Sequence, residues 1–265
     1  MIPEFIDAEA LWSRWTAPSA GLVVPLGLGP SGEVVDLDLS EPTAHHLLIG
    51  GSTGSGKSVL LNMVVAGLTR HYGADRVQVA AIDPKASAFD WLEAWPHCLA
   101  PVAVTMAATE ALLDRVLHLM LHRHQLLQVA EVDSIQGFNA RADQTQPSLV
   151  LLVDEILDVS FDAEEIAERL LLLLHHGGRA GIHVLATTQR PTGLPAEMIE
   201  AFPARIAMRT PVVDDSLLML GSPGAAQLTG RGHALLRTAE SDELVTYRGA
   251  YVDEALPLRG VAGPR

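Results

Sequence analysis

Lysine is nearly absent from this chain. Lysine and arginine together number 18, yet only two of these residues are lysines, Lys57 and Lys85. Arginine stands at every other cationic position, so the two lysines mark places where a compact point charge is needed instead of a planar guanidinium. Both lysines are therefore candidates for a chemical role.

Cysteine and long apolar runs are also scarce. The single cysteine, Cys98, cannot form a disulfide within the chain, which fits a reducing cytoplasm. No run approaches the roughly 18 apolar residues that a membrane-spanning helix requires, and no basic segment precedes an apolar one near residue 1, as in a secretory leader. We therefore expect a soluble, cytoplasmic protein with no membrane segment of its own.

Positive charge is in short supply as well. The formal net charge is -14 at pH 7, and the sequence contains no basic run. Non-specific affinity for DNA comes from phosphate neutralisation by clustered Lys and Arg, so this charge argues against a general nucleic-acid coat. Any contact with DNA has to be local, for example on the basic lining of a ring whose exterior is acidic.

A glycine-rich stretch surrounds the first lysine. Residues 51–58 have the spacing of a P-loop, in which backbone N–H groups close around phosphate oxygens and the lysine reaches the β- and γ-phosphates. An apolar strand at 46–49 precedes the loop and an apolar helix at 58–70 follows it, so a helix N-terminus would face the phosphates. The predicted ligands of ATP are Gly51, Ser52, Thr53, Gly54, Ser55, Gly56, Lys57 and Ser58, and the Ser58 hydroxyl would also bind Mg²⁺.

Two carboxylates end a second apolar strand, at residues 148–153. Asp154 and Glu155 follow it directly, and ligands of open α/β sheets bind at such carboxyl ends of strands. The pair could simply begin a loop. Its combination with the P-loop favours ATP hydrolysis, with Asp154 in the Mg²⁺ shell and Glu155 polarising the attacking water.

Strands and helices alternate from residue 45 onward. This order predicts an α/β fold with a mostly parallel sheet covered by helices on both faces, and turn signals predict short hairpins near both termini. A helix and hairpin appendage is expected at 1–40, an ATPase domain at 41–252 and a tail at 253–265. The expected strands lie at 22–28, 34–39, 77–82, 102–104, 149–153, 182–187, 204–208, 233–237 and 244–252, and the expected helices at 58–70, 107–129, 163–177 and 196–202, with a polar connection at 131–147.

Further patterns follow the P-loop in a fixed order and resemble the motor domain of the FtsK/SpoIIIE DNA translocases, within the FtsK/HerA superfamily of P-loop ATPases. The resemblance covers roughly residues 22–252. Besides the P-loop, it rests on the stretches at 82–85 (Ile-Asp-Pro-Lys), 135–139 (Ile-Gln-Gly-Phe-Asn), 152–155 (Leu-Val-Asp-Glu), 178–191, 203–207 and 230–232.

The resemblance implies a RecA-like ATPase that works as a hexameric ring and pumps double-stranded DNA without sequence preference. It implies that Lys57, Asp154 and Glu155 are catalytic and that Gln189 senses the γ-phosphate. An arginine finger from a neighbouring subunit is also expected. Arg123 is the first candidate for it, and Arg179 and Arg205 are the alternatives.

The chain also departs from the family pattern. Asp133-Ser134 stands where the family often carries an arginine, and the sequence holds neither the membrane helices nor the winged-helix domain of chromosomal translocases. We therefore expect a stand-alone motor of a plasmid, phage or mobile element, serving DNA transfer or segregation. Two alternatives remain: an ATPase like those of type VII secretion, which moves or remodels proteins, and a scaffold that binds nucleotide without turnover. The Asp154-Glu155 pair and Gln189 argue against the scaffold.

Overall fold

Strands from distant parts of the sequence meet in two units of this computed structural model, which describes residues 5–89, 91–160 and 163–252. We call the first the P-loop unit; it contains Met1–His71 and Thr187–Arg265. The second, which we call the carboxylate unit, contains Tyr72–Ala186. The boundary between them falls inside strand β6 (Ile182–Thr188).

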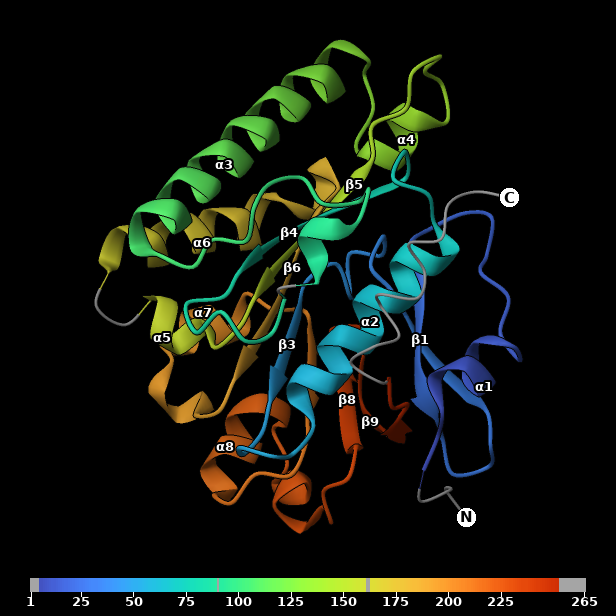
Figure 1. The fold of residues 1–265 in the computed structure, drawn as a ribbon, viewed down its shortest axis with the longest axis vertical. Helices are drawn as coiled ribbons and strands as arrows, with labels where there is room; N and C mark the ends of the chain where they lie inside the picture. Colours follow the sequence, from blue (N-terminus) through green and yellow to red (C-terminus); the bar gives the residue numbers. More distant parts are fainter. Residues whose placement is uncertain (1–4, 90, 161–162, 253–265) are drawn as a thin grey trace. The chain divides into compact units, whose positions relative to one another are not determined.

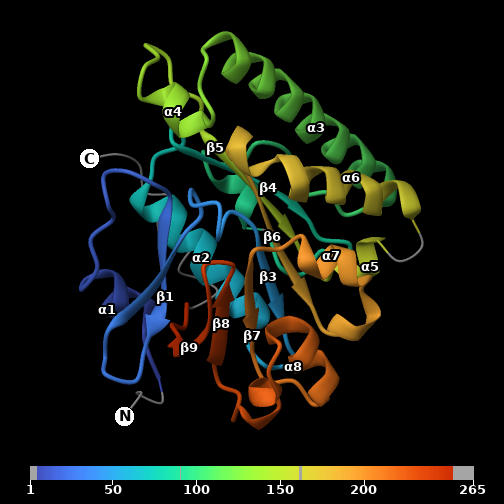
Figure 2. The ribbon, with the colours of Figure 1, turned by 180° about the vertical axis from the view of Figure 1, so that it is seen from behind.

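The P-loop unit carries a mixed set of strands in the order β2-β1-β9-β8-β7-β3. Strands β3 and β7 pair in parallel, whereas the pairs β1–β2, β1–β9, β7–β8 and β8–β9 are antiparallel. Figure 2 shows β7, β8 and β9 side by side. The bounds are β1 (Val23–Leu28), β2 (Val34–Asp38), β3 (Leu47–Gly50), β7 (Ala204–Ala207), β8 (His233–Thr238) and β9 (Ser241–Gly249).

Both expected hairpins are confirmed. Strands β1 and β2 enclose the predicted turn at 29–32, because glycine and proline there interrupt two apolar runs. Strands β8 and β9 form the second hairpin, but its turn lies at 239–240, earlier than expected. The acidic residues Asp242 and Glu243 therefore belong to β9 instead of the turn.

Helix α2 (Lys57–His71) is apolar around most of its circumference and buries ten of its residues. It packs on β1, as Figure 1 shows. Gly67 permits this close approach, because a Cβ there would lie 3.2 Å from Val24 Cγ2. The other helices of this unit are α1 (Ala8–Trp12), α7 (Ala196–Glu200) and α8 (Val213–Leu220), with 3-10 turns at Pro191–Gly193 and Pro223–Gln227.

The strands described in the carboxylate unit are parallel. Strand β5 (Ser148–Val153) pairs with β4 (Val77–Ile82) on one side and with β6 on the other. All three are nearly continuous apolar runs, as expected of parallel strands buried on both faces. The expected strand at 102–104 is wrong: Ala103 forms an isolated bridge with Ile82, since Pro101 offers no N–H to a longer ladder.

Long helices flank these strands. Helix α3 (Met106–Val129) is capped by Thr105, whose hydroxyl accepts a hydrogen bond from Ala108 N, and it packs on α6 (Glu164–His176). Figure 1 shows α3 and α6 next to each other. Arg169 Nε joins the two helices through a 2.9 Å ion pair with Asp114. Two short helices were not expected, α4 (Ile135–Asn139) and α5 (Ile156–Ser160), and 3-10 turns lie at Leu92–Ala94 and Gly178–Ala180.

The observed architecture corrects one part of the predicted fold class. The α/β class is confirmed, and so are the helices expected at 58–70, 107–129, 163–177 and 196–202, which correspond to α2, α3, α6 and α7. The sheet, however, is mixed instead of mostly parallel. The domain boundary at residue 40 stays a prediction, and the tail at 253–265 lies outside the described residues. Within the described part of the chain, no helix combines the length and apolar character needed to cross a membrane.

Candidate nucleotide site

The P-loop connects β3 to α2 and adopts backbone conformations that favour glycine. Gly54 has a φ of +75° and Gly56 a φ of +107°. Residues with a side chain are strained in this region of backbone conformation, whereas glycine is not. A Cβ on Gly56 would also lie 3.1 Å from Met208 Cε. The glycine pattern therefore reflects the shape of this loop.

Lys57 is the first residue of α2, and its side chain is buried. Its ammonium donates to the carbonyl oxygens of Gly51 at 2.8 Å and Ser52 at 3.1 Å. A buried charge is stable only when such partners compensate its loss of water. The loop thus holds a positive charge inside the glycine-rich turn, where the sequence predicted it.

The predicted sensor, Gln189, lies beside the P-loop. Its Oε1 accepts a hydrogen bond of 2.8 Å from the Thr53 hydroxyl. Backbone bonds from Gly51 N to Thr188 O (3.2 Å) and from Ser52 N to Arg209 O (2.9 Å) anchor the same loop. The sequence separates Thr53 from Gln189 by 136 positions, and the fold brings them into contact.

Ser58 is exposed in the first turn of α2, one position after the buried lysine. Mg²⁺ prefers oxygen ligands and keeps several waters, so an exposed hydroxyl beside a phosphate loop fits it. Ser58 therefore remains a suitable Mg²⁺ ligand on chemical grounds.

Asp154 and Glu155 follow β5 in the carboxylate unit. Asp154 N donates to Ile82 O at 3.0 Å, which fixes the turn to the end of β4. Glu155 is buried and has a φ of +52°. Left-handed backbone at a non-glycine residue costs free energy and is found chiefly at functional sites. The backbone conformation of Glu155 therefore makes it a candidate functional residue.

The second lysine belongs to the same unit as this acidic pair. Lys85 Nζ forms a 2.9 Å ion pair with Asp158 Oδ2, on the helix that begins just after Glu155. The hydrogen bond to Asp158 is the main cause of a raised Lys85 pKa, and the carboxylates of Glu155 and Asp154 add to it. Asp158 was not among the predicted site residues, because helix α5 was not expected.

A buried aspartate shapes the loop that carries Lys85. The carboxylate of Asp83 accepts hydrogen bonds from the backbone N–H groups of Lys85 (3.2 Å), Ser87 (2.8 Å) and Ala88 (2.7 Å). An aspartate that bonds to the backbone ahead of it in this way stabilises a turn. The Asp-Pro-Lys pattern therefore combines a loop organiser with the lysine that it presents.

Arg123 is buried within α3, at 1% exposure. Its guanidinium donates to Ala180 O at 2.8 Å and to Pro147 O at 2.6 Å, and burial lowers its pKa to about 10. An arginine finger has to reach a nucleotide on a neighbouring subunit, whereas this guanidinium is held by its own chain. These contacts hold the Arg123 guanidinium within its own chain, and its role as a finger stays a prediction.

The two alternative arginines differ in exposure. Arg179 has an exposed side chain, which donates to Asp133 O at 2.8 Å and pairs with Asp133 Oδ1 at 3.2 Å. Arg205 is half-buried, and its Nε donates to Phe202 O at 3.1 Å. Burial and the charge of Arg237 lower the pKa of Arg205. Of the two, Arg179 is the more accessible.

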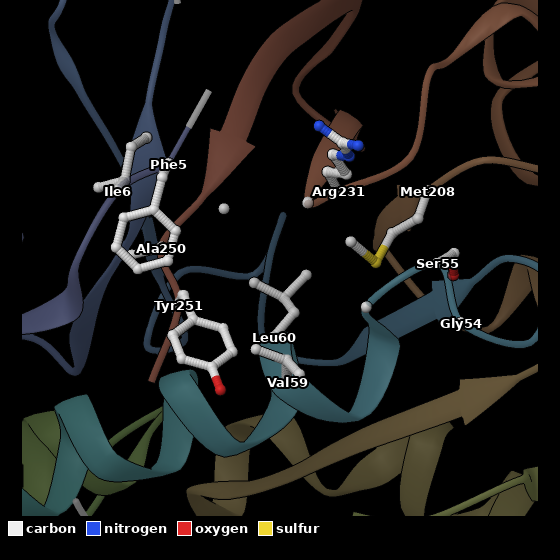
Figure 3. A pocket seen from close by; sticks show the side chains of 13 residues that line it. Phe5, Ile6, Gly54, Ser55, Val59, Leu60, Met208, Arg231, Ala250 and Tyr251 are labelled. Carbon is white, nitrogen blue, oxygen red and sulfur yellow. The ribbon is translucent and has the colours of Figure 1, made fainter. Parts of the chain in front are cut away.

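A pocket of about 390 Å³ adjoins the P-loop (Figure 3). Sequence reasoning missed it, since its residues come from five separate segments of the P-loop unit and no local pattern joins them. The pocket is lined by Phe5, Ile6, Gly54, Ser55, Gly56, Val59, Leu60, Met208, Arg231, Gly232, Gly249, Ala250 and Tyr251.

The FtsK/SpoIIIE family model matches residues 8–239. The chain belongs to the FtsK/SpoIIIE family. It is therefore a P-loop ATPase, with the P-loop in one unit and the acidic strand end in the other. The family resemblance inferred from the separated motifs is confirmed.

Two relatives are proteins described as DNA translocase FtsK. The protein of Streptococcus pneumoniae is 32% identical over 263 residues, which cover 94% of this chain and 34% of the relative. The protein of Lactiplantibacillus plantarum is 33% identical over 250 residues, with 89% and 31% covered. The chain thus spans about a third of the length of these relatives.

Solved structures show the same fold. The cytoplasmic domain of the type VII secretion ATPase EccC of Thermomonospora curvata is 28% identical, with a TM-score of 0.79 over all of this chain and 33% of that one. The conjugation coupling protein TcpA of pCW3, solved with ATPγS, is 20% identical, with a TM-score of 0.83 and coverages of 98% and 74%. These likenesses support the RecA-like ATPase fold.

Proposed function

We propose that this chain is the motor of an ATP-dependent translocase of double-stranded DNA. The observation that carries the proposal is the 32% identity to a DNA translocase over 94% of the chain, with the P-loop and the acidic pair intact. A location in the cytoplasm and a role for a plasmid, phage or mobile element stay predictions from the sequence.

The predicted site residues other than Arg123 have these roles in the proposal. The P-loop amides and the Lys57 ammonium would bind the phosphates, and Ser58 and Asp154 are each suited by their oxygen atoms to Mg²⁺, which would neutralise phosphate charge when bound. Glu155 accepts a hydrogen bond from the attacking water and orients it. Gln189 responds to the γ-phosphate, and the Thr53 hydroxyl is its partner at the loop.

The proposed assembly is a ring, with hexamer as the expected size. A finger supplied by a neighbour needs an exposed guanidinium, so Arg179 takes the place of Arg123 in this role. Mixing Arg179→Ala subunits into the wild-type protein should then lower the ATPase rate by more than their share. Strict proportionality would show that Arg179 acts within its own chain.

The DNA proposal is tested by ATPase rates on random-sequence linear duplexes of increasing length, at two salt concentrations. A translocase should hydrolyse ATP faster as duplex length increases, and scrambling the sequence should change nothing. With a net charge of -14, few phosphates can be contacted, so the stimulation should show a shallow dependence on salt. A rate independent of duplex at every length and both salt concentrations would refute DNA as cargo.

A second candidate is an ATPase that moves or remodels proteins. The 28% identity to EccC over the whole of this chain favours it. Such an ATPase would ignore duplex in the assay above and would respond to a partner polypeptide. The same measurement therefore separates the two functions.

A further inference from the structure

A buried aspartate stands in the first turn of helix α8. Asp215 is 4% exposed, and its Oδ1 accepts a 3.0 Å hydrogen bond from Thr192 N. Thr192 belongs to the 3-10 turn at Pro191–Gly193, which begins two residues after Gln189. Burial of a carboxylate is costly unless a hydrogen bond compensates its loss of water. The bond to Thr192 N therefore ties the start of α8 to this turn.

The neighbouring Asp214 shows that the start of the helix does not by itself account for Asp215. Both carboxylates lie in the first turn of α8, where negative charge interacts favourably with the helix dipole. Asp214 is exposed, so it provides this interaction and stays in water. Asp215 is buried and bonds to a segment 23 positions earlier in the chain. Its position therefore indicates a role in the placement of that segment.

Packing joins the same helix and turn to the strand before the P-loop. Gly50 ends β3, and a Cβ there would lie 3.0 Å from Met219 Cε of α8 and 3.2 Å from Pro191 Cγ. Helix α8 also packs on β7, the parallel neighbour of β3, as Figure 2 shows. Because close-packed groups leave little free space, the turn cannot shift without moving α8 or the end of β3.

The segment between β6 and this turn carries the predicted sensor. Gln189 Oε1 accepts a 2.8 Å hydrogen bond from the Thr53 hydroxyl of the P-loop. Arg190 N donates to Thr188 Oγ1 at 3.3 Å, and Gly193 N donates to Arg190 O at 2.9 Å. These short-range bonds connect the residues on both sides of Gln189 to the turn. The position of Gln189 at the P-loop thus depends on where the turn is held.

We propose that Asp215 is a positioning residue for ATP hydrolysis, which holds the turn at 191–193 so that Gln189 stays within reach of the γ-phosphate. Its carboxylate acts through the backbone of Thr192 and not on the phosphate itself. A small displacement of a group that contacts the transition state can slow a reaction strongly while substrate binding is kept. The inference rests on the proposed role of Gln189 in ATP hydrolysis.

Steady-state ATPase kinetics of the full chain test this proposal. Asp215→Ala should lower kcat about tenfold or more and keep the KM for ATP within about twofold of the wild-type value, because the phosphate-binding loop is intact. Asp214→Ala is the matched control, since it removes a carboxylate from the same helical turn, and it should leave both parameters unchanged. Asp215→Asn keeps an oxygen that can accept from Thr192 N and should restore most of the wild-type kcat.

A double variant separates positioning from support of the fold. If Asp215 acts through Gln189, Asp215→Ala should have no further effect on kcat in a chain that already carries Gln189→Ala. A general loss of folded structure would instead lower kcat by the same factor in both backgrounds. Such multiplicative losses would overturn the proposal, and so would a wild-type kcat in Asp215→Ala.

Asp215→Ser covers the case in which Asp215→Ala does not fold. Its hydroxyl is polar but one bond shorter than the carboxylate, so it should reproduce the loss of kcat in a folded protein. If neither variant folds, Asp215 supports the fold and the proposal is wrong. A wild-type kcat in Gln189→Ala would refute the proposed sensor and this inference with it. A slow Gln189→Ala beside a wild-type kcat in Asp215→Ala would refute the positioning role alone.

Discussion

The two units bind charge in different ways. In the P-loop unit, a turn shaped by glycines encloses one buried ammonium, and its main partners are backbone groups. In the carboxylate unit, side-chain carboxylates follow parallel strands, and Glu155 is one of three non-glycine residues described there that have a positive φ. Backbone amides suit the binding of phosphate, whereas a positioned carboxylate suits proton and water chemistry. The difference suggests that one unit governs binding of ATP and the other its turnover.

The largest expected effect concerns the two lysines, one in each unit. Lys57→Ala should weaken ATP binding by roughly 100-fold or more, because several charge-assisted hydrogen bonds to phosphate are lost together. Lys85→Ala is the matched control and should bind ATP like the wild type. Isothermal titration of both variants checks this. Equal affinities of the two variants for ATP would contradict the proposal that the P-loop unit alone governs ATP binding.

A second prediction concerns stability within the carboxylate unit. Arg123→Met should lower the free energy of unfolding by about 3 kcal/mol, because the carbonyl groups of Ala180 and Pro147 lose their buried donor. Arg115→Met, at an exposed position on the same helix, should change it by less than about 0.5 kcal/mol. Urea unfolding measures both. Similar losses would show that the buried contacts of Arg123 contribute little.

The smallest effect on stability is expected at the ion pair of Lys85. Its two side chains are 50% and 44% exposed, so breaking the pair should cost about 0.2–1 kcal/mol of stability. Lys85→Ala should leave the basal ATPase rate unchanged and abolish its stimulation by DNA, if the pair couples the acidic site to cargo. Asp158→Asn should reproduce this behaviour. If DNA still stimulates the ATPase rate fully in both variants, the ion pair has no part in coupling.

The sequence predicted some elements closely, for physical reasons. Strand β4 was expected at its observed bounds, because a parallel strand buried on both faces is a continuous apolar run between polar residues. The P-loop was found from spacing alone, since its glycines and lysine act locally. The antiparallel majority of the P-loop unit was harder to foresee, because strand partners such as β1 and β9 are distant in the chain.

Helix α8 and the burial of Arg123 both have local signals in the sequence. Helix α8 has Asp214 and Asp215 in its first turn and ends at Gly221 with a φ of +71°, which are ordinary helix start and stop signals. Arg123 shares helical spacing with the buried residues Val116, Met120 and Leu127, which places it on the inner face of α3. That periodicity favours a buried arginine over a finger.

The pocket residues carried no such signal. Met208 and Tyr251 lie in segments whose local patterns predict only strands, and Phe5 lies in a segment with no assigned pattern. Their proximity depends on the pairing of Tyr251 with Ile6 and on the hairpin of β8 and β9. Sequence-based reasoning finds chemistry that depends on spacing, and it misses sites that depend on tertiary pairing.

The most direct test of the division between binding and turnover is to measure ATP affinity and the single-turnover hydrolysis rate in Glu155→Gln. Glutamine keeps the size of the side chain and removes the carboxylate that would polarise water. We predict wild-type affinity for ATP with a hydrolysis rate lowered by about 100-fold or more, in line with the loss of a general base. Hydrolysis at the wild-type rate, or a loss of ATP binding as large as that of Lys57→Ala, would contradict the account.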